Sequence, residues 1–305
     1  MTPAERAHIL AGFGIDERAL IGEGLESRVY ALSDELVLRL GRSGVPTPDQ
    51  HRLKVFLDGI ADHLPFATPR IVELGPKGQW RIERRLPGGS LLTRLRRLSD
   101  DRRDEALRNY VSAADTLGSV RFEHLPYGHL LARNPVTAPD WHAFLRETLS
   151  HFVSRNRLTI AHEVGDPYRL HDLAADMIVG LPRDPPKALV HGDYFPGNVM
   201  VGPDLKVTAV LDFGHYTVVG DAILDLAVSY LTLELIEETA AQDARFVHEV
   251  VRERHGDAIA AACRFYRAWL AFSMADPAHG RQPYPHMFRW AVTMLRLLGD
   301  GRLAA

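Results

Sequence analysis

The chain has almost no cysteine and no marked excess of charge of either sign. Cys263 is the only cysteine among 305 residues, so no disulfide can form within the chain. A chain without disulfides is typical of a reducing compartment, and we expect Cys263 to be a small buried residue of a helix. The net charge of −3 gives no broad attraction to nucleic acid or to anionic membranes. We therefore expect no nucleic-acid partner.

The sequence also lacks the usual signals of export or membrane insertion. Its first residues, Met1 to Arg6, contain no basic segment leading into an apolar one. No apolar run approaches the length of a membrane span, and we find no internal repeat and no low-complexity segment. The sequence therefore predicts a cytoplasmic protein without membrane contact, and nothing in it indicates an obligate protein partner.

The overall composition is that of an ordinary globular protein. Hydrophobic residues make up 46% of the chain and charged residues 25%. At this length the chain can form two lobes, each with a substantial core.

Two short motifs carry the chemistry. Residues 191–198 read His-Gly-Asp-Tyr-Phe-Pro-Gly-Asn, and Asp212-Phe213-Gly214 begins fourteen residues after Asn198. In protein kinases a catalytic-loop Asp accepts the proton of the substrate hydroxyl, an Asn five residues later holds magnesium, and the Asp of an Asp-Phe-Gly turn holds magnesium as well. The spacing therefore predicts Asp193 as the catalytic base and Asn198 and Asp212 as ligands of Mg²⁺.

The segment between these motifs is predicted to be a hairpin. The strands 199–201 and 207–211 flank a turn at Gly202-Pro203-Asp204. A hairpin brings its two ends together, so Asn198 and Asp212 are expected to share one ion. The alternative is that residues 191–193 form an ordinary turn and Asp212 merely caps a strand.

This block resembles the aminoglycoside phosphotransferase family, whose fold is related to that of protein kinases and whose catalytic loop has His-Gly-Asp in place of His-Arg-Asp. Residues 220–227 resemble the family's Gly-Asp-Pro-x-x-Asp-Leu-Ala segment, with Ala222 in place of Pro. The resemblance implies that Asp225 braces the catalytic loop. Asp225 is also placed to act as an acidic residue at the N-terminus of a helix over 223–235, and the two roles are compatible. We expect His191 to orient the loop through hydrogen bonds, because Asp193 already supplies the base.

The hydrophobic pattern changes near residue 88. Before it, alternating residues predict a helix from Asp49 to about His63 and five strands, at 19–21, 28–32, 36–40, 70–74 and 79–84. Beyond Pro87-Gly88-Gly89, helical periodicity dominates, with Asp140 capping one helix and three or four more after Asp221. We therefore predict an α+β, protein-kinase-like fold, with a small antiparallel-sheet N-lobe over 1–87 and a larger helical C-lobe over 88–305.

The nucleotide is expected to bind at the first strands. Gly22, Gly24 and Ser27 lie in the turn between strands one and two, where glycines let backbone N–H groups approach phosphate oxygens. An ordinary hairpin turn is the alternative. By the resemblance Arg39 stands where the family often has a Lys that contacts the inner phosphates, and a guanidinium can take this role with a different geometry.

Two features of the nucleotide site stay open. The family's acidic partner for this basic residue would lie near Gln50, and we find no acid at a suitable position there. The segment Glu83–Leu86, with Glu83 and Arg85 as its site residues, is predicted to be the hinge whose backbone pairs with the purine. Backbone pairing leaves no side-chain signature, so the co-substrate is ATP or GTP.

The acceptor is expected to be a hydroxyl of a small molecule. Glu234, Glu237 and Glu238 follow the catalytic block, and in antibiotic kinases of this family acids in that region face cationic amino sugars. An exposed acidic helix face is the alternative. We predict an amino-sugar antibiotic, an aminoglycoside or a macrolide. The alternatives are a metabolic kinase for an amino alcohol, a sugar or homoserine, and a catalytically idle kinase-like module. The presence of Asp193, Asn198 and Asp212 together argues against the idle module.

Overall fold

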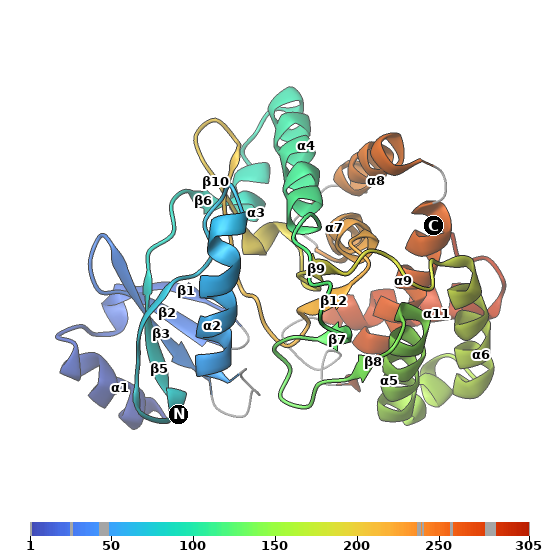
Figure 1. Ribbon diagram of the computed structural model, residues 1–305, viewed down its shortest axis with the longest axis horizontal. Helices are drawn as coiled ribbons and strands as arrows, with labels where there is room; N and C mark the ends of the chain where they lie inside the picture. The colour runs from blue at the N-terminus through green and yellow to red at the C-terminus, as the bar shows by residue number, and fades with distance from the viewer. Residues whose placement is uncertain are drawn as a thin grey trace.

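The N-terminal part of the computed structural model is built on one antiparallel sheet (Figure 1). The structure describes residues 2–24, 27–42, 49–236, 239, 241–256, 259–277 and 285–304. In spatial order the strands of this sheet are β1 (Leu20–Glu23), β2 (Ser27–Ala31), β3 (Leu36–Gly41), β5 (Trp80–Arg84) and β4 (Ile71–Leu74). All five strands expected from the alternating pattern are present, with ends that differ by a residue or two.

Helix α1 (Pro3–Gly12) precedes this sheet, and the sequence analysis assigned no element to this segment. Its start is a capping box, in which the side chain of Thr2 accepts from the backbone of Glu5 and the Glu5 side chain accepts in return. Leu10 of α1 packs in a small core of the sheet. The Thr-Pro-x-Glu pattern was a readable signal for this helix.

Helix α2 (Gln50–Ile60) belongs to the N-terminal part by sequence but packs into the larger core. Its side chains Leu53 and Leu57 are buried and join the same hydrophobic cluster as the helices of the C-terminal part. After α2, Ala67 forms a parallel bridge with Ala209. The two lobes are therefore joined by α2 and the segment after it, in addition to the chain that links them.

The chain crosses between the lobes at residues 85–88 and then enters a second, small sheet. Strand β6 (Gly89–Ser90) pairs with β10 (Val199–Val201), which pairs with β11 (Val207–Val210). Gly88 has a φ of +98°, and a Cβ there would lie 2.5 Å from Oγ1 of Thr208, so this crossing requires glycine. The predicted hairpin after Asn198 is thus present as β10 and β11.

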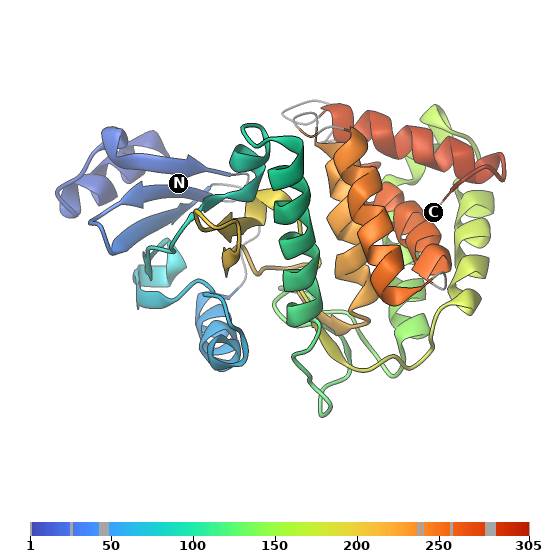
Figure 2. The same ribbon diagram turned by 90° about the horizontal axis from the view of Figure 1, so that it is seen from above.

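Helices form most of the C-terminal part, as the green, orange and red elements of Figures 1 and 2 show. They are α3 (Leu91–Leu95), α4 (Asp100–Leu117), α5 (Trp141–Glu163), α6 (Pro167–Met177), α7 (Ile223–Leu235), α8 (Ala241–His255), α9 (Ile259–Met274) and α11 (Pro285–Gly299). Asp140 caps α5 as expected. The fold is α+β and kinase-like, as predicted.

A third sheet, which was not predicted from the sequence, carries the loop that contains Asp193. Its order is β8 (Thr137–Ala138), β7 (Tyr127–His129), β12 (Val218–Gly220) and β9 (Ala188–Val190). These strands have two or three residues each, too few for an alternating pattern to be recognised. Because β9 and β12 are paired, the loops that follow β9 and precede β12 lie at one edge of this sheet.

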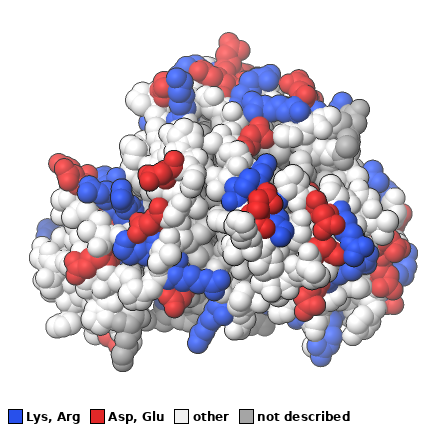
Figure 3. All heavy atoms as spheres, in the orientation of Figure 1, with Lys and Arg blue, Asp and Glu red and all other residues white. Residues whose placement is uncertain are grey.

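Cys263 is buried on α9, as expected from the sequence. Trp269 and Phe272 of the same helix are also buried, in the large core. In the described residues no helix has both the length and the apolarity to cross a membrane. On the face shown in Figure 3, acidic and basic side chains are interspersed.

Candidate active site

The loop after β9 begins with a fully buried histidine. Nε2 of His191 lies 2.7 Å from the carbonyl of Leu211, and Nδ1 accepts a hydrogen bond from the backbone N–H of Asp193 at 3.2 Å. With Nδ1 as acceptor, Nε2 carries the proton and donates. Burial lowers the pKa of His191 to about 4, so the imidazole is neutral at physiological pH. His191 thus ties the loop that carries Asp193 to the strand that leads to Asp212, and its orienting role in catalysis stays a prediction.

Asp225 braces the same loop from α7. Its two carboxylate oxygens accept the backbone N–H groups of His191 at 2.6 Å and Gly192 at 2.8 Å. Burial raises the pKa of Asp225 to about 7, against the opposite effect of these two donors. Gly192 has a φ of +78°, and a Cβ there would lie 2.1 Å from the carbonyl oxygen of Tyr216. The loop therefore requires both the glycine and the carboxylate that accepts from it.

Asp193 and Asn198 face each other across the loop. Nδ2 of Asn198 donates to the backbone oxygen of Asp193 at 3.0 Å and to its carboxylate Oδ2 at 3.2 Å. Asn198 is 4% exposed, so its side chain is fixed. With Nδ2 directed at Asp193, the carbonyl oxygen Oδ1 is the atom of Asn198 left to meet a cation.

The β10–β11 hairpin brings Asp212 beside Asn198. The backbone N–H of Leu211 donates to the carbonyl of Asn198 at 2.8 Å, which continues the ladder between the two strands. Asp212 has a φ of +56°, an uncommon conformation for a residue with a side chain and one that recurs at functional sites. Its side chain is 47% exposed and lies at the cleft.

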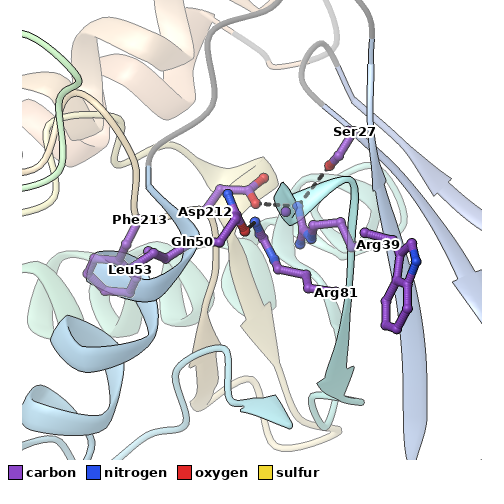
Figure 4. Close-up of a pocket in the computed structure, with 10 residues that line it drawn as sticks. Ser27, Arg39, Gln50, Leu53, Arg81, Asp212 and Phe213 are labelled. Carbon is purple, nitrogen blue, oxygen red and sulfur yellow. Dashed lines mark hydrogen bonds and ion pairs between the residues drawn. The ribbon is translucent and has the colours of Figure 1, made fainter. Parts of the chain in front are cut away.

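Arg39 of β3 contacts Asp212 across the cleft (Figure 4). Its Nη1 lies 2.7 Å from Oδ1 of Asp212 and also donates to the hydroxyl of Ser27 at 3.0 Å. The positive charge of Arg39 is the largest influence on Asp212 and lowers the pKa of its carboxyl. The basic residue predicted for the inner phosphates and the acid predicted for the metal therefore meet directly.

Besides Asp212, Arg39 has a buried acidic partner within the first sheet, and this partner is on β5 and not on α2. Nε of Arg39 lies 3.4 Å from Oε2 of Glu83, which is 3% exposed. Glu83 also receives a 2.5 Å contact from Nε of Arg81, whose Nη1 donates to Oε1 of Gln50 at 2.6 Å. The motif spacing did not predict this partner, because β3 and β5 are far apart along the chain and meet only in the sheet.

The predicted hinge concerns the backbone of residues 83–86. The side chain of Glu83 contacts Arg39 and Arg81. The backbone N–H groups of Arg84 and Arg85 donate to the carbonyls of Arg70 and Glu35. These two N–H groups are therefore already used within the sheet, and purine recognition by this segment stays a prediction.

Gly22 and Gly24 lie on and just after β1, with Ser27 at the start of β2. Among the described residues, a Cβ on either glycine would meet nothing closer than 3.8 Å, and neither glycine has a positive φ. The described part of the fold therefore does not require glycine at these positions.

A small cavity lies between this sheet, α2 and the Asp212 segment (Figure 4). Its volume is about 40 Å³, little more than one water molecule takes up. Its polar lining consists of Ser27, Arg39, Gln50, Arg81 and Asp212.

The acids predicted to face the acceptor are only partly described. Glu234, near the end of α7, is ion-paired with Arg267 through two contacts, at 2.5 and 3.0 Å, and receives the indole N–H of Trp290 at 3.4 Å. Its charge is therefore balanced within the protein. Glu237 and Glu238 lie outside the described residues.

The comparison with family models decides the family. The model of the phosphotransferase enzyme family (APH) matches residues 17–287. The chain belongs to this family. It is a nucleotide-dependent small-molecule phosphotransferase, and the resemblance seen in the motifs is confirmed. No curated protein sequence matched the chain.

Solved structures of the family share its fold. The ternary complex of a thermostable APH(4)-Ia mutant with ADP and hygromycin B matches with a TM-score of 0.68 at 16% identity, over 100% of both chains. The GDP and kanamycin complex of APH(2″)-IIIa has a TM-score of 0.62 at 15% identity, over 92% of both chains. The macrolide 2′-phosphotransferase MphH from Brachybacterium faecium has a TM-score of 0.57 at 19% identity, over 94% of this chain and 96% of that one. Likeness at these identities shows the fold.

Proposed function

We propose that this phosphotransferase moves the γ-phosphate of ATP or GTP to a hydroxyl of an amino-sugar antibiotic, with Asp193 as the base. The observation that carries the proposal is the geometry of three side chains. The carboxylate of Asp193 accepts a hydrogen bond from the amide of Asn198, and Asn198 and Asp212 lie at the two ends of the β10–β11 hairpin. In this family's chemistry the protein mainly positions the reactants and stabilises charge.

The residues at this point suit Mg²⁺. Magnesium prefers oxygen ligands and keeps several waters, so one or two protein ligands suffice. Oδ1 of Asn198 and the carboxylate of Asp212 would hold the ion, and no group of three acidic, His or Cys side chains competes as a metal site among the described residues. When bound, the ion would neutralise charge on the phosphate oxygens.

The chain's own residues would perform the remaining steps. The carboxylate of Asp193 takes the proton of the acceptor hydroxyl as that oxygen bonds to phosphorus and the nucleoside diphosphate leaves. The amide of Asn198 holds this carboxylate in place, and His191 stays neutral and fixes the loop. Gly22 and Gly24 would let backbone N–H groups of β1 and β2 approach the phosphates, since the described part of the fold gives no other reason for glycine there.

A metabolic acceptor is the second candidate, and one observation favours it. Glu234 is paired with Arg267, so this described acid offers no uncompensated charge to a cationic amino sugar. Among the metabolic acceptors considered, a neutral sugar does not need that charge, whereas an amino alcohol and homoserine carry an ammonium group of their own. An idle module is disfavoured, because such a module has no use for Asp193, Asn198 and Asp212 in this arrangement.

The deciding experiment is an acceptor screen. Release of ADP or GDP from Mg²⁺ and ATP or GTP would be measured with aminoglycosides, macrolides, amino alcohols, sugars and homoserine. Phosphorylation of an antibiotic supports the proposal, and phosphorylation of a metabolite alone replaces it with the second candidate. The Asp193→Ala variant, tested beside the wild type, identifies turnover that comes from this site.

A further inference from the structure

Glu83 lies between two guanidinium groups on the cleft side of the N-terminal sheet. Arg39 of β3 is the register partner of Arg81 on β5, and Glu83 follows two residues after Arg81. Side chains two apart on a strand point to the same face, so all three meet there. We name Arg39, Arg81, Glu83 and Gln50 the Glu83 cluster.

The contacts of Glu83 divide between its two oxygens. Oε1 lies 2.5 Å from Nε of Arg81, and Oε2 lies 3.4 Å from Nε of Arg39, an ion pair rather than a hydrogen bond. Burial by itself raises the pKa of Glu83, but Arg39 and then Arg81 outweigh it and hold the pKa below its usual value. A carboxylate buried to this degree is retained only with such partners.

The charge balance of the cluster suits a phosphate ligand. Two guanidinium groups and one carboxylate leave the cluster itself with one net positive charge. In this structure Asp212, which lines the same cavity, balances that charge through its 2.7 Å contact with Arg39 (Figure 4). Gln50, the α2 side chain in contact with the cluster, accepts from Arg81 without adding charge. A glutamate at position 50 would cancel the net charge.

We infer that Glu83 of β5, and not an acid on α2, is the positioning residue of Arg39, and that Arg81, held by Gln50, keeps the cluster positive toward the nucleotide phosphates. The inference rests on the proposed kinase function. Arg39 is held on one side through Nε by Glu83. Its Nη1, which contacts Asp212 and Ser27 in this structure, is then free to turn to a phosphate while the anchor persists.

The first test measures the dissociation constants of Mg²⁺-nucleotide complexes by calorimetry. Arg81→Met should weaken binding about tenfold or more, since it removes the cation that balances Glu83. Gln50→Glu should weaken binding at least about threefold, because it keeps an oxygen that accepts from Arg81 and adds a negative charge. Gln50→Met removes that acceptor without adding charge, and it should weaken binding less than Gln50→Glu does. Arg52→Met, which removes an exposed arginine of α2, is the matched control and should bind as the wild type does.

The second test separates positioning from structural support. Glu83→Gln removes the anchor of Arg39 and adds positive charge, so nucleotide binding should hold or tighten while turnover falls about tenfold or more. A purely structural role would instead lower the melting temperature and weaken binding together. The double variant Glu83→Gln/Gln50→Glu moves the carboxylate to α2, and its turnover should stay low.

Each outcome has a definite meaning. If Gln50→Glu and Gln50→Met bind alike, or Arg81→Met binds as the wild type does, the charge argument is overturned. If the double variant recovers wild-type turnover, the choice of β5 over α2 is overturned. If the wild type neither binds nucleotide nor releases nucleoside diphosphate, the proposed function has failed, independently of the cluster.

Discussion

His191 connects the loop that carries Asp193 to the segment that carries Asp212. Its Nε2 contacts the carbonyl of Leu211, its ring packs 4.6 Å from that of Phe213, and its own carbonyl accepts from Thr217. A protonated ring would turn Nδ1 from acceptor to donor against the N–H of Asp193. Burial lowers the pKa of His191, so the ring stays neutral and keeps these hydrogen bonds, as an orienting residue needs.

The first prediction concerns Asp193. Asp193→Ala should lower turnover by about 10²–10⁴-fold, because it removes the group that takes the acceptor proton. Nucleotide binding should stay within about threefold of the wild type, since Arg39, Asn198 and Asp212 are unchanged. Steady-state kinetics and calorimetry measure the two effects. Wild-type turnover in this variant would exclude Asp193 as the base.

The second prediction compares Gly192, where the backbone conformation requires glycine, with Gly24, where we expect the ligand to require it. Gly24→Ala should change the free energy of unfolding by less than about 1 kcal/mol, because among the described residues a Cβ there meets only the Ser27 carbonyl, at 3.9 Å. It should nevertheless weaken nucleotide binding. Gly192→Ala should destabilise the fold by about 2 kcal/mol or more, because its φ is positive and the Tyr216 carbonyl blocks the added carbon.

Urea unfolding and nucleotide titration of both variants test this pair. A Gly24→Ala protein that binds nucleotide as the wild type does would remove the β1–β2 turn from the phosphate site.

Among the larger elements, α7 and strand β9 together hold the catalytic loop. Asp225, in the first turn of α7, accepts hydrogen bonds from the backbone N–H groups of the first two residues after β9. Strand β9 itself is paired with β12. Both roles considered for Asp225 are therefore compatible with its position, and the bracing contacts are the ones the structure shows.

The third prediction follows from the opposite titrations of Asp225 and His191. The pKa of Asp225 is raised to about 7 in the fold, so its contribution to stability is full below its unfolded value near 4 and is lost as pH rises through 7. The pKa of His191 is lowered to about 4, so its contribution is full above 6.5 and is lost as pH falls toward 4. The two effects oppose each other between pH 4 and 7.

Asp225→Asn removes one of these two titrations. The difference in unfolding free energy between wild type and variant should therefore grow as pH falls from 7 to 4, by up to roughly 4 kcal/mol. Urea unfolding at several pH values measures it, with Asp104→Asn on α4 as an exposed control. A difference that is constant with pH would show that Asp225 is ionised throughout.

Across the molecule, the candidate nucleotide site uses both lobes. Arg39, Gly24 and Glu83 come from the first sheet, whereas Asn198 and Asp212 come from the hairpin of the second lobe. Helix α2 packs against both lobes, and the ring centroid of its Phe56 lies 5.8 Å from that of Phe213. The boundary at residue 87 stays a prediction, and the large core extends from the helices of the C-terminal part into α2.

The fourth prediction concerns the stability that this shared site confers. Nucleotide with Mg²⁺ at about 100 times its dissociation constant should stabilise the fold by about 2.7 kcal/mol. Chelating the metal with EDTA, or the change Asp212→Asn, should remove most of that gain, because the strongest anionic ligand is lost. Thermal unfolding with and without nucleotide measures both. An equal shift in the presence of EDTA would contradict the assignment of Asp212 to the metal.

The sequence by itself determined the catalytic motifs, the strands of the first sheet and the family. These features are local, because a loop such as His191–Asn198 is defined by its own residues and an alternating strand by its own pattern. The assignment of Asp225 to the loop followed from the same kind of match.

The tertiary structure decided which distant side chains meet. Glu83 pairs with Arg39 because β3 and β5 are neighbours in a register that aligns Val37 with Glu83. Glu234 is balanced by Arg267 because α7 and α9 pack together. Such ion pairs depend on register and on which helix faces come together, and no spacing along one segment encodes them. The short strands β7, β9 and β12 owe their existence to the same long-range pairing.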